Sequence, residues 1–207
     1  MVAFADDDSW WAPGSLAAAA TIFEQHPRVG LLHGRVLVEP GGHLDPVCLQ
    51  MGAGPVEDGL PGPSIIGHLG CGAVVRRSAY LDAGGYSEVL GFGGEEALLA
   101  LDLAAGGWAQ CYVETLVAHH APSTQRDDRD SRWALCRRND TLTALMRLPR
   151  STAALAVVGL LRQAAADRNV RRELPAFVRR LPTAIRERRP VSEEVWQQWR
   201  TVRSAAG

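Results

Sequence analysis

The sequence contains no lysine, so each of its 22 basic side chains is an arginine guanidinium. Guanidinium groups suit bidentate binding of carboxylate or phosphate, but a codon-composition bias explains the absence equally well, and we favour that cause. The charge is nevertheless segregated. Residues 1–125 carry four arginines and fourteen acids, whereas residues 126–207 carry eighteen arginines and nine acids. An acidic first part suits cation binding, and a basic second part suits an anionic partner such as a phospholipid surface or a lipid-linked phosphate.

Long apolar runs and cysteine motifs are also missing. The longest apolar run, residues 153–161, is about half the length of a membrane span. Met1 is followed by aspartates and not by a basic and then apolar segment, so no secretory signal is expected. The four cysteines lack metal-ligand spacing and are expected to be buried thiols of a cytoplasmic protein. With 207 residues, 46% of them hydrophobic, the chain can bury a core.

The most informative segment is residues 2–16, where an apolar strand runs into three consecutive aspartates, two tryptophans and a predicted helix. Three adjacent carboxylates repel one another and are costly without a cation between them. Mg²⁺ or Mn²⁺ bound to a diphosphate is a suitable cation, because hard cations prefer oxygen ligands. The alternative is a solvated acidic turn that caps the helix at Ser15. The segment alone does not decide between them.

Three further segments follow in order: GCGAVVRRSAYLDAGGY at 70–86, FGGEEALLALDLAAGGW at 92–108 and VAHHAPS at 117–123. With the aspartates, they resemble the motifs of family 2 glycosyltransferases of the GT-A type. These motifs are a strand-end DxD, an acceptor-side strand with an arginine pair, a helix that carries the catalytic base, and a histidine that closes the metal site. The resemblance covers about residues 1–125.

The resemblance implies an α/β fold, namely a partial GT-A mixed sheet with flanking helices. Residues 1–125 would form a truncated GT-A domain, and residues 126–207 a basic, helical C-terminal segment. Family members have about a hundred residues before the DxD, so the chain resembles the C-terminal half of the catalytic domain, with the N-terminal nucleotide-binding half missing. A partner chain would be one source of that half, and the chain alone is expected to transfer little sugar.

The resemblance also assigns a metal site. Asp8 would be a ligand of Mg²⁺ or Mn²⁺, with Asp6 nearer the ribose or on the same ion. His119 or His120 would add a nitrogen ligand, which is compatible with Mn²⁺. Two histidines at a strand end are more often structural, although their position here favours a site role for one of them.

The catalytic base is expected at Glu96, the position that matches the aspartate base of the family, with Glu95 beside it as the second candidate. Such a base must lie within hydrogen-bond reach of the acceptor hydroxyl. The alternative is that both glutamates only stabilise a helix N-terminus, where the dipole favours anions.

Other candidates contact substrate in the same interpretation. Arg76 and Arg77 would bind phosphate, although surface ion pairing is slightly favoured for them. Trp11, and Trp10 beside it, would stack on a sugar, although large rings are more often buried in a core.

The predicted function is metal-assisted, inverting transfer of a sugar from a nucleotide sugar to a hydroxyl acceptor, either a glycan or lipid-linked, with no nucleic-acid partner. The alternative is a non-catalytic remnant that acts only as a binding module. The predicted location is cytoplasmic. The basic segment would contact the inner face of the membrane peripherally, or its arginines would pair with the acidic first part.

Local patterns predict several elements. We expect strands at 2–5, 29–38, 65–75, 108–113 and 116–120, and helices at 15–27, 78–83, 95–105, 131–148, 151–166, 169–180 and 191–203. Residues 40–64, rich in glycine and proline, are expected to form a long loop. Pro175 and Pro182 are expected to begin or interrupt a helix.

Overall fold

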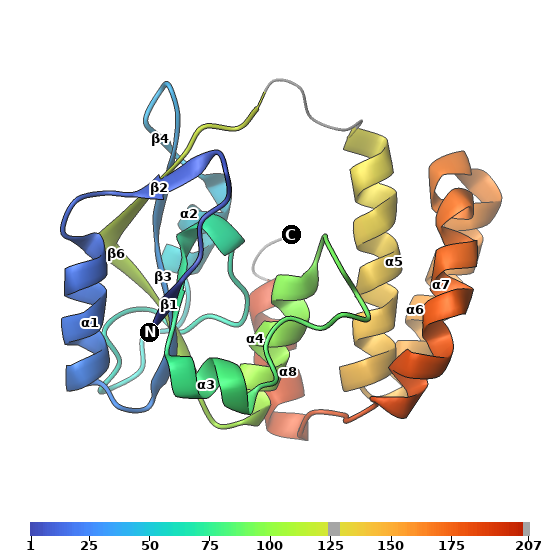
Figure 1. Ribbon diagram of the computed structural model, residues 1–207. Coiled ribbons are helices and arrows are strands. Elements are labelled where there is room, and N and C mark those ends of the chain that lie inside the picture. The colour runs from blue at the N-terminus through green and yellow to red at the C-terminus, as the bar shows by residue number, and fades with distance from the viewer. Residues whose placement is uncertain (124–128, 205–207) are drawn as a thin grey trace. The chain divides into compact units, whose positions relative to one another are not determined.

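The computed structural model describes residues 1–123 and 129–204, with the side chains of 202–204 left aside (Figure 1). The chain divides into two compact units. The sheet unit consists of the described residues within 1–85, 100–124 and 197–207. The helical unit consists of those within 86–99 and 125–196. The units are therefore not consecutive in the sequence. The predicted boundary between residues 125 and 126 lies outside the described residues.

A mixed sheet forms the centre of the sheet unit, in the order β1-β5-β3-β6-β2, with β4 paired to β3. β3 and β6 are parallel and the other pairs are antiparallel. The strands are β1 (Val2–Ala3), β2 (Ser9–Trp11), β3 (Val29–Val38), β4 (His43–Leu44), β5 (Ala73–Val75) and β6 (Ala109–His120). The predicted strand at 29–38 is confirmed, and the two expected at 108–120 are one long strand with a register shift.

Helix α1 (Ser15–Gln25) covers one face of this sheet. Ala19 and Phe23 pack in a cluster with buried residues of β3, β5 and β6. The helix begins after Gly14, which has a left-handed backbone, and no side chain caps it. The Ser15 hydroxyl instead accepts a hydrogen bond from the Val117 N–H at 3.0 Å. The alternative in which the aspartates serve a helix cap at Ser15 is therefore wrong.

The expectation for the next segment is also wrong, and the strand or strand pair expected within 65–75 is confirmed only in its last part. The expected loop at 40–64 contains β4 and α2 (Pro46–Gly52), because Asp45 caps α2 by accepting from the Val47 N–H and the following proline suits a first helical position. Within 65–75, only β5 is a strand, preceded by a 3₁₀ turn, η1 (Gly70–Gly72). Glycine-rich segments carry little periodicity, so neither element was visible in the sequence.

The helical unit is built on α5 (Arg129–Arg147), α6 (Arg150–Ala166) and α7 (Arg168–Arg186), which pack side by side (Figure 1). Leu142, Met146, Leu160 and Phe177 lie in their common core. Contrary to expectation, α7 continues through Pro175 and Pro182. Both prolines, and the residues four positions before them, are exposed, so water can reach the carbonyls that lose their partners.

Three helices complete the fold: α3 (Arg77–Asp82), α4 (Glu95–Ala105) and α8 (Glu193–Ser204). The first two confirm predicted helices, and Gly84 and Gly85 end α3 with positive φ angles. The fold class is thus the predicted mixed α/β class with flanking helices and helical C-terminal elements.

Candidate functional site

The three aspartates lie in a tight turn between β1 and β2. The Ser9 Oγ accepts from the Asp6 N–H at 2.7 Å, and the Ser9 N–H donates to the Asp6 carbonyl at 3.1 Å. Asp6 and Asp7 are exposed, whereas Asp8 is half-buried. The serine therefore fixes the turn through the backbone and leaves the carboxylates available for other contacts.

The turn places Asp8 against the end of β6. β2 pairs antiparallel with β6, with Ser9 opposite His120, and the Ala121 N–H donates to the Asp8 carbonyl at 2.8 Å. The Asp8 Oδ1 and the His120 Nε2 are 3.4 Å apart, and both side chains are about one-fifth exposed (24% and 17%). The structure therefore brings together two of the predicted metal ligands, one from each of two distant motifs.

His119 has different partners. Its Nδ1 lies 2.8 Å from the Glu39 Oε1, and its ring stacks on Trp10 at 5.2 Å between centroids with an angle of 7° between planes. Successive strand residues point to opposite faces of a sheet, so the neighbouring histidines are directed apart. His120 is accordingly the histidine that accompanies Asp8.

Glu39 is a site residue that the sequence interpretation did not include. It follows β3, and its N–H donates to the His120 carbonyl at 2.8 Å. β3 and β6 are parallel, so their carboxyl ends meet at one edge, where ligands commonly bind in α/β sheets. A carboxylate at the end of a predicted strand was the signal, but the parallel pairing was not visible in the sequence.

The electrostatic field at this edge is negative. Burial, followed by the charges of Asp6, Asp45 and Asp8, raises the pKa of the Cys71 thiol to about 12. Three carboxylates from two separate parts of the chain, the aspartate turn and Asp45, thus act on one buried group. This field favours a cation and opposes an unaccompanied anion.

Asp8 and His120 fit a divalent cation as one oxygen and one nitrogen ligand, with the remaining positions left to phosphate and water. Within residues 1–123 and 129–204, no group of three or more His, Cys, Asp or Glu side chains lies close enough to hold a metal. The predicted set of Asp6, Asp8, His119 and His120 is therefore not assembled around one point, and metal binding stays a prediction.

The predicted substrate-binding residues differ in their surroundings. The Arg76 guanidinium donates to the backbone carbonyls of Val29, Phe23 and His26, at 2.9, 2.7 and 3.1 Å, and lies over the Phe23 ring. These contacts give Arg76 a structural role at the end of α1. Arg77 is exposed. The indole N–H of Trp11 donates to the Phe4 carbonyl at 3.0 Å, which ties β2 to the end of β1.

The two glutamates lie at the start of α4, in the part assigned to the helical unit. Both are half-buried, and the Glu95 Oε2 is fully buried without a hydrogen-bond partner. Gly91, Gly93 and Gly94 precede them with positive φ angles, which a side chain would strain. The glycine-rich turn thus delivers both carboxylates to the helix N-terminus.

Asn139 of α5 holds this turn. Its side-chain N–H₂ donates to the carbonyls of Leu90, Phe92 and Gly93 at 3.2, 3.0 and 2.6 Å, and the residue is fully buried. Its Oδ1 accepts from the Arg138 guanidinium, which also contacts Glu173 at 2.5 Å. The sequence did not reveal this role, because nothing local marks a residue whose partners lie about 46 positions earlier.

Two buried histidines stand apart from these groups. Burial lowers the pKa of His33, on β3, to about 4, against a smaller effect of the Gly34 backbone. Burial, followed by the charge of His33, lowers the pKa of His68 to about 3. Gly72 packs so tightly on the His33 ring that a Cβ there would lie 2.7 Å from its Nε2. Both histidines are therefore neutral core residues near neutral pH.

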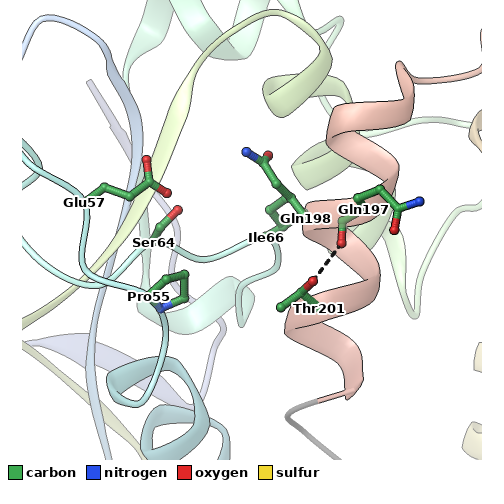
Figure 2. A pocket seen from close by; sticks show the side chains of 7 residues that line it. All are labelled: Pro55, Glu57, Ser64, Ile66, Gln197, Gln198 and Thr201. Atoms are coloured by element: carbon green, nitrogen blue, oxygen red, sulfur yellow. Dashed lines mark hydrogen bonds between the residues drawn. The ribbon is translucent and has the colours of Figure 1, made fainter.

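A cavity of about 240 Å³ lies elsewhere in the sheet unit. Loop residues Pro55, Glu57, Ser64 and Ile66 face Gln197, Gln198 and Thr201 of α8 across it (Figure 2). Ser64 is bridged to Cys111, near the start of β6, whereas His120 ends that strand. None of the predicted site residues lines this cavity.

No protein-family model matches the chain. Among curated proteins, the chain is 32% identical over 151 residues to N-acetylglucosaminyl-diphospho-decaprenol L-rhamnosyltransferase from two strains of Mycobacterium tuberculosis. The match covers 61% of this chain and 49% of the relative, so the chain spans about half the length of the curated relatives it matches. The chain is thus related to glycosyltransferases. No described helix is long and apolar enough to cross a membrane.

Proposed function

We propose that the chain carries part of the active site for inverting, metal-assisted transfer of a sugar from a nucleotide sugar to a hydroxyl acceptor, as in family 2 transferases of the GT-A type. The observation that carries this proposal is the Asp8–His120 pair at 3.4 Å, at the edge where the parallel strands β3 and β6 end. The relationship to a rhamnosyltransferase supports the same reaction class.

In this proposal, Asp8 and His120 hold the divalent cation, Mg²⁺ or Mn²⁺, and Asp6 lies toward the ribose. Such a cation stabilises the negative charge that develops on the leaving diphosphate. The negative field of Asp6, Asp8 and Asp45 attracts the cation and makes metal-free binding of a diphosphate unfavourable.

The remaining chemistry belongs to a carboxylate. The acceptor oxygen attacks the anomeric carbon, the bond from that carbon to the diphosphate oxygen breaks, and the acceptor proton passes to the base. Glu96 is the base in this proposal, with Glu95 as the second candidate. The buried, unpaired Oε2 of Glu95 is the observation that keeps this second candidate. One displacement at one carbon inverts its configuration.

The acceptor proposed here is lipid-linked, since the curated relatives are named for an acceptor on diphospho-decaprenol. Arg77, exposed at the start of α3, is the better placed of the two arginines to contact an anionic group, because Arg76 is engaged by backbone carbonyls.

Titration calorimetry with Mn²⁺, with and without a nucleoside diphosphate, tests this proposal. We expect Asp8→Asn to weaken Mn²⁺ binding at least tenfold, since it removes one of two charged or coordinating ligands. Asp7→Asn is the matched control, because Asp7 lies in the same turn but is exposed. Equal losses of Mn²⁺ affinity in the two variants would show that the cation responds to the negative charge of the turn in general and not to Asp8 as a ligand. Unchanged binding in Asp8→Asn would leave the chain as a non-catalytic binding module.

A further inference from the structure

The outer faces of α6 and α7 combine exposed aliphatic side chains with arginines. On α6, Leu155, Val158 and Leu161 are between 43% and 72% exposed, and their spacing of three places them along one stripe. On α7, Val178 and Ile185 are about 60% exposed (61% and 58%) and seven residues apart, which also places them on one side. Other sides of both helices are buried in the core with α5, and on α7 the buried Phe177 and Ala184 directly precede Val178 and Ile185.

The charge on this surface has one sign. Residues 150–186 contain eight arginines and only two acids, Asp167 and Glu173. Asp167 caps α7 by accepting from the N–H groups of Asn169 and Val170, and Glu173 contacts Arg138 at 2.5 Å. Both acids are therefore used within the unit.

Several arginines remain exposed beside the aliphatic stripes. Arg162 lies next to Leu161 on α6, and α7 exposes Arg172, Arg179 and Arg186, whereas Arg171 donates to the carbonyls of Ala164 and Ala165. The pairs at 171–172, 178–179 and 185–186 repeat every seven residues and therefore lie on one side of α7. The first pair is two arginines, and each of the other two is an aliphatic residue followed by an arginine. An interfacial helix has this pattern of apolar residues beside basic ones.

We propose that the outer faces of α6 and α7 form a docking surface for an anionic phospholipid membrane, with the helices lying at the interface. A second copy of the chain is a poorer occupant, because a symmetric contact would bring the arginines of the two copies together. The exposed apolar residues are aliphatic, whereas the anchors of protein interfaces are enriched in Trp and Tyr. The surface would hold the chain near a lipid-linked acceptor, although vesicle binding requires no turnover and is independent of the proposed reaction.

Vesicle co-sedimentation of the full chain tests this proposal, with phosphatidylcholine alone and with phosphatidylcholine mixed with phosphatidylglycerol. We expect binding to the anionic vesicles only, reversed by high salt, because the attraction falls off within a Debye length. Replacing Leu155 and Leu161 with Gln and Val158 with Thr is expected to weaken binding at least tenfold.

The chain offers matched controls for both parts of the surface. Leu49→Gln, Val56→Thr and Leu81→Gln, combined, change the same residue types at sites of the sheet unit that are 55% to 80% exposed. Arg162→Gln with Arg179→Gln should weaken binding roughly thirtyfold, whereas Arg28→Gln with Arg200→Gln, two exposed arginines of the sheet unit, should change it little. Circular dichroism and melting curves confirm that each variant is folded.

Three results would overturn the proposal. The first is equal binding to neutral and anionic vesicles, or none to either. The second is an equal loss in the control variants. The third is a dimer, seen by sedimentation velocity, that the α6 variant dissociates while vesicle binding is unchanged, which would assign the stripe to self-association.

Discussion

The sheet unit and the helical unit use charge in opposite ways. At the edge of the sheet, Asp6 and Asp7 are exposed and Asp8 has an imidazole beside it, so negative charge is concentrated. In the helical unit, many guanidinium groups donate to backbone carbonyls near helix ends. Examples are Arg171 to Ala164 and Ala165, and Arg188 to Leu145 and Leu148.

This difference shows that net charge alone does not identify a binding surface. Much of the positive charge in the helical unit caps helices, since basic groups stabilise the carbonyl ends. Arg76 does the same for α1 in the sheet unit. Exposed arginines without such a structural task remain to serve an anionic partner. They include Arg77 in the sheet unit and Arg162, Arg172, Arg179 and Arg186 on the outer faces of α6 and α7.

The largest expected effect concerns the glutamates that begin α4. In an enzyme restored with a nucleotide-binding half, Glu96→Gln should lower sugar transfer by about 10²–10⁴-fold while leaving nucleotide-sugar binding nearly unchanged, because the amide cannot accept the acceptor proton. Transfer is measured with a labelled nucleotide sugar and a lipid-diphosphate acceptor. Glu95→Gln is the paired variant. A loss confined to Glu95→Gln would move the base by one residue, to the carboxylate with the buried, unpaired oxygen.

The next effect tests the interior of the helical unit. Asn139→Leu removes three hydrogen bonds to the turn at 90–93 and a partner of Arg138, and should lower the free energy of unfolding by about 3 kcal/mol or more. Urea denaturation measures this loss. Asn169→Ala, at a half-buried position of α7, should change it by less than about 0.5 kcal/mol. Similar values for the two would contradict the anchoring role of Asn139.

A third effect separates the two arginines of the sheet unit. Arg76→Gln should lower the free energy of unfolding by about 2 kcal/mol, because three backbone carbonyls lose a charged donor. Arg77→Gln, its exposed neighbour, should change stability by less than about 0.5 kcal/mol. The comparison is made from the midpoints of urea denaturation, provided that the free energy of unfolding depends on urea concentration with the same slope in both variants. If Arg76→Gln were as stable as the unchanged protein, the structural role of Arg76 would be contradicted, and a substrate-binding role would again be the better interpretation.

The last effect, the smallest for one residue over one pH unit, is a pH dependence in the sheet unit. The folded pKa values of His33 and His68, about 4 and about 3, lie below the ordinary value of 6.5. The unfolded state thus takes up protons first, and stability falls as the pH drops below about 6.5 toward these folded values. Each histidine contributes about 1.4 kcal/mol per pH unit in this window. His33→Phe should flatten the measured slope, and His43→Gln, at an exposed site, should leave it unchanged.

The sequence was sufficient where a signal is local. The apolar, β-rich composition of 29–38 predicted β3, and the apolar face of 95–105 with the following glycines predicted α4. It was insufficient at 40–64, where glycine and proline concealed β4 and α2. It also failed at Pro175 and Pro182, because whether a helix tolerates proline depends on the exposure of carbonyls elsewhere on the helix.

For the candidate site, the sequence by itself determined the residue types: three consecutive aspartates, two adjacent histidines and two glutamates at a helix start. The tertiary structure alone decided their partners. In the fold, Asp8 lies beside His120 and Glu39 lies beside His119. Arg76 donates to carbonyls at the end of α1, and Asn139 donates to carbonyls of the turn before α4. The physical reason is that a strand's neighbours and register are set by hydrogen bonds to residues far away in the chain, while sequence patterns report only the local preference and the face that is buried.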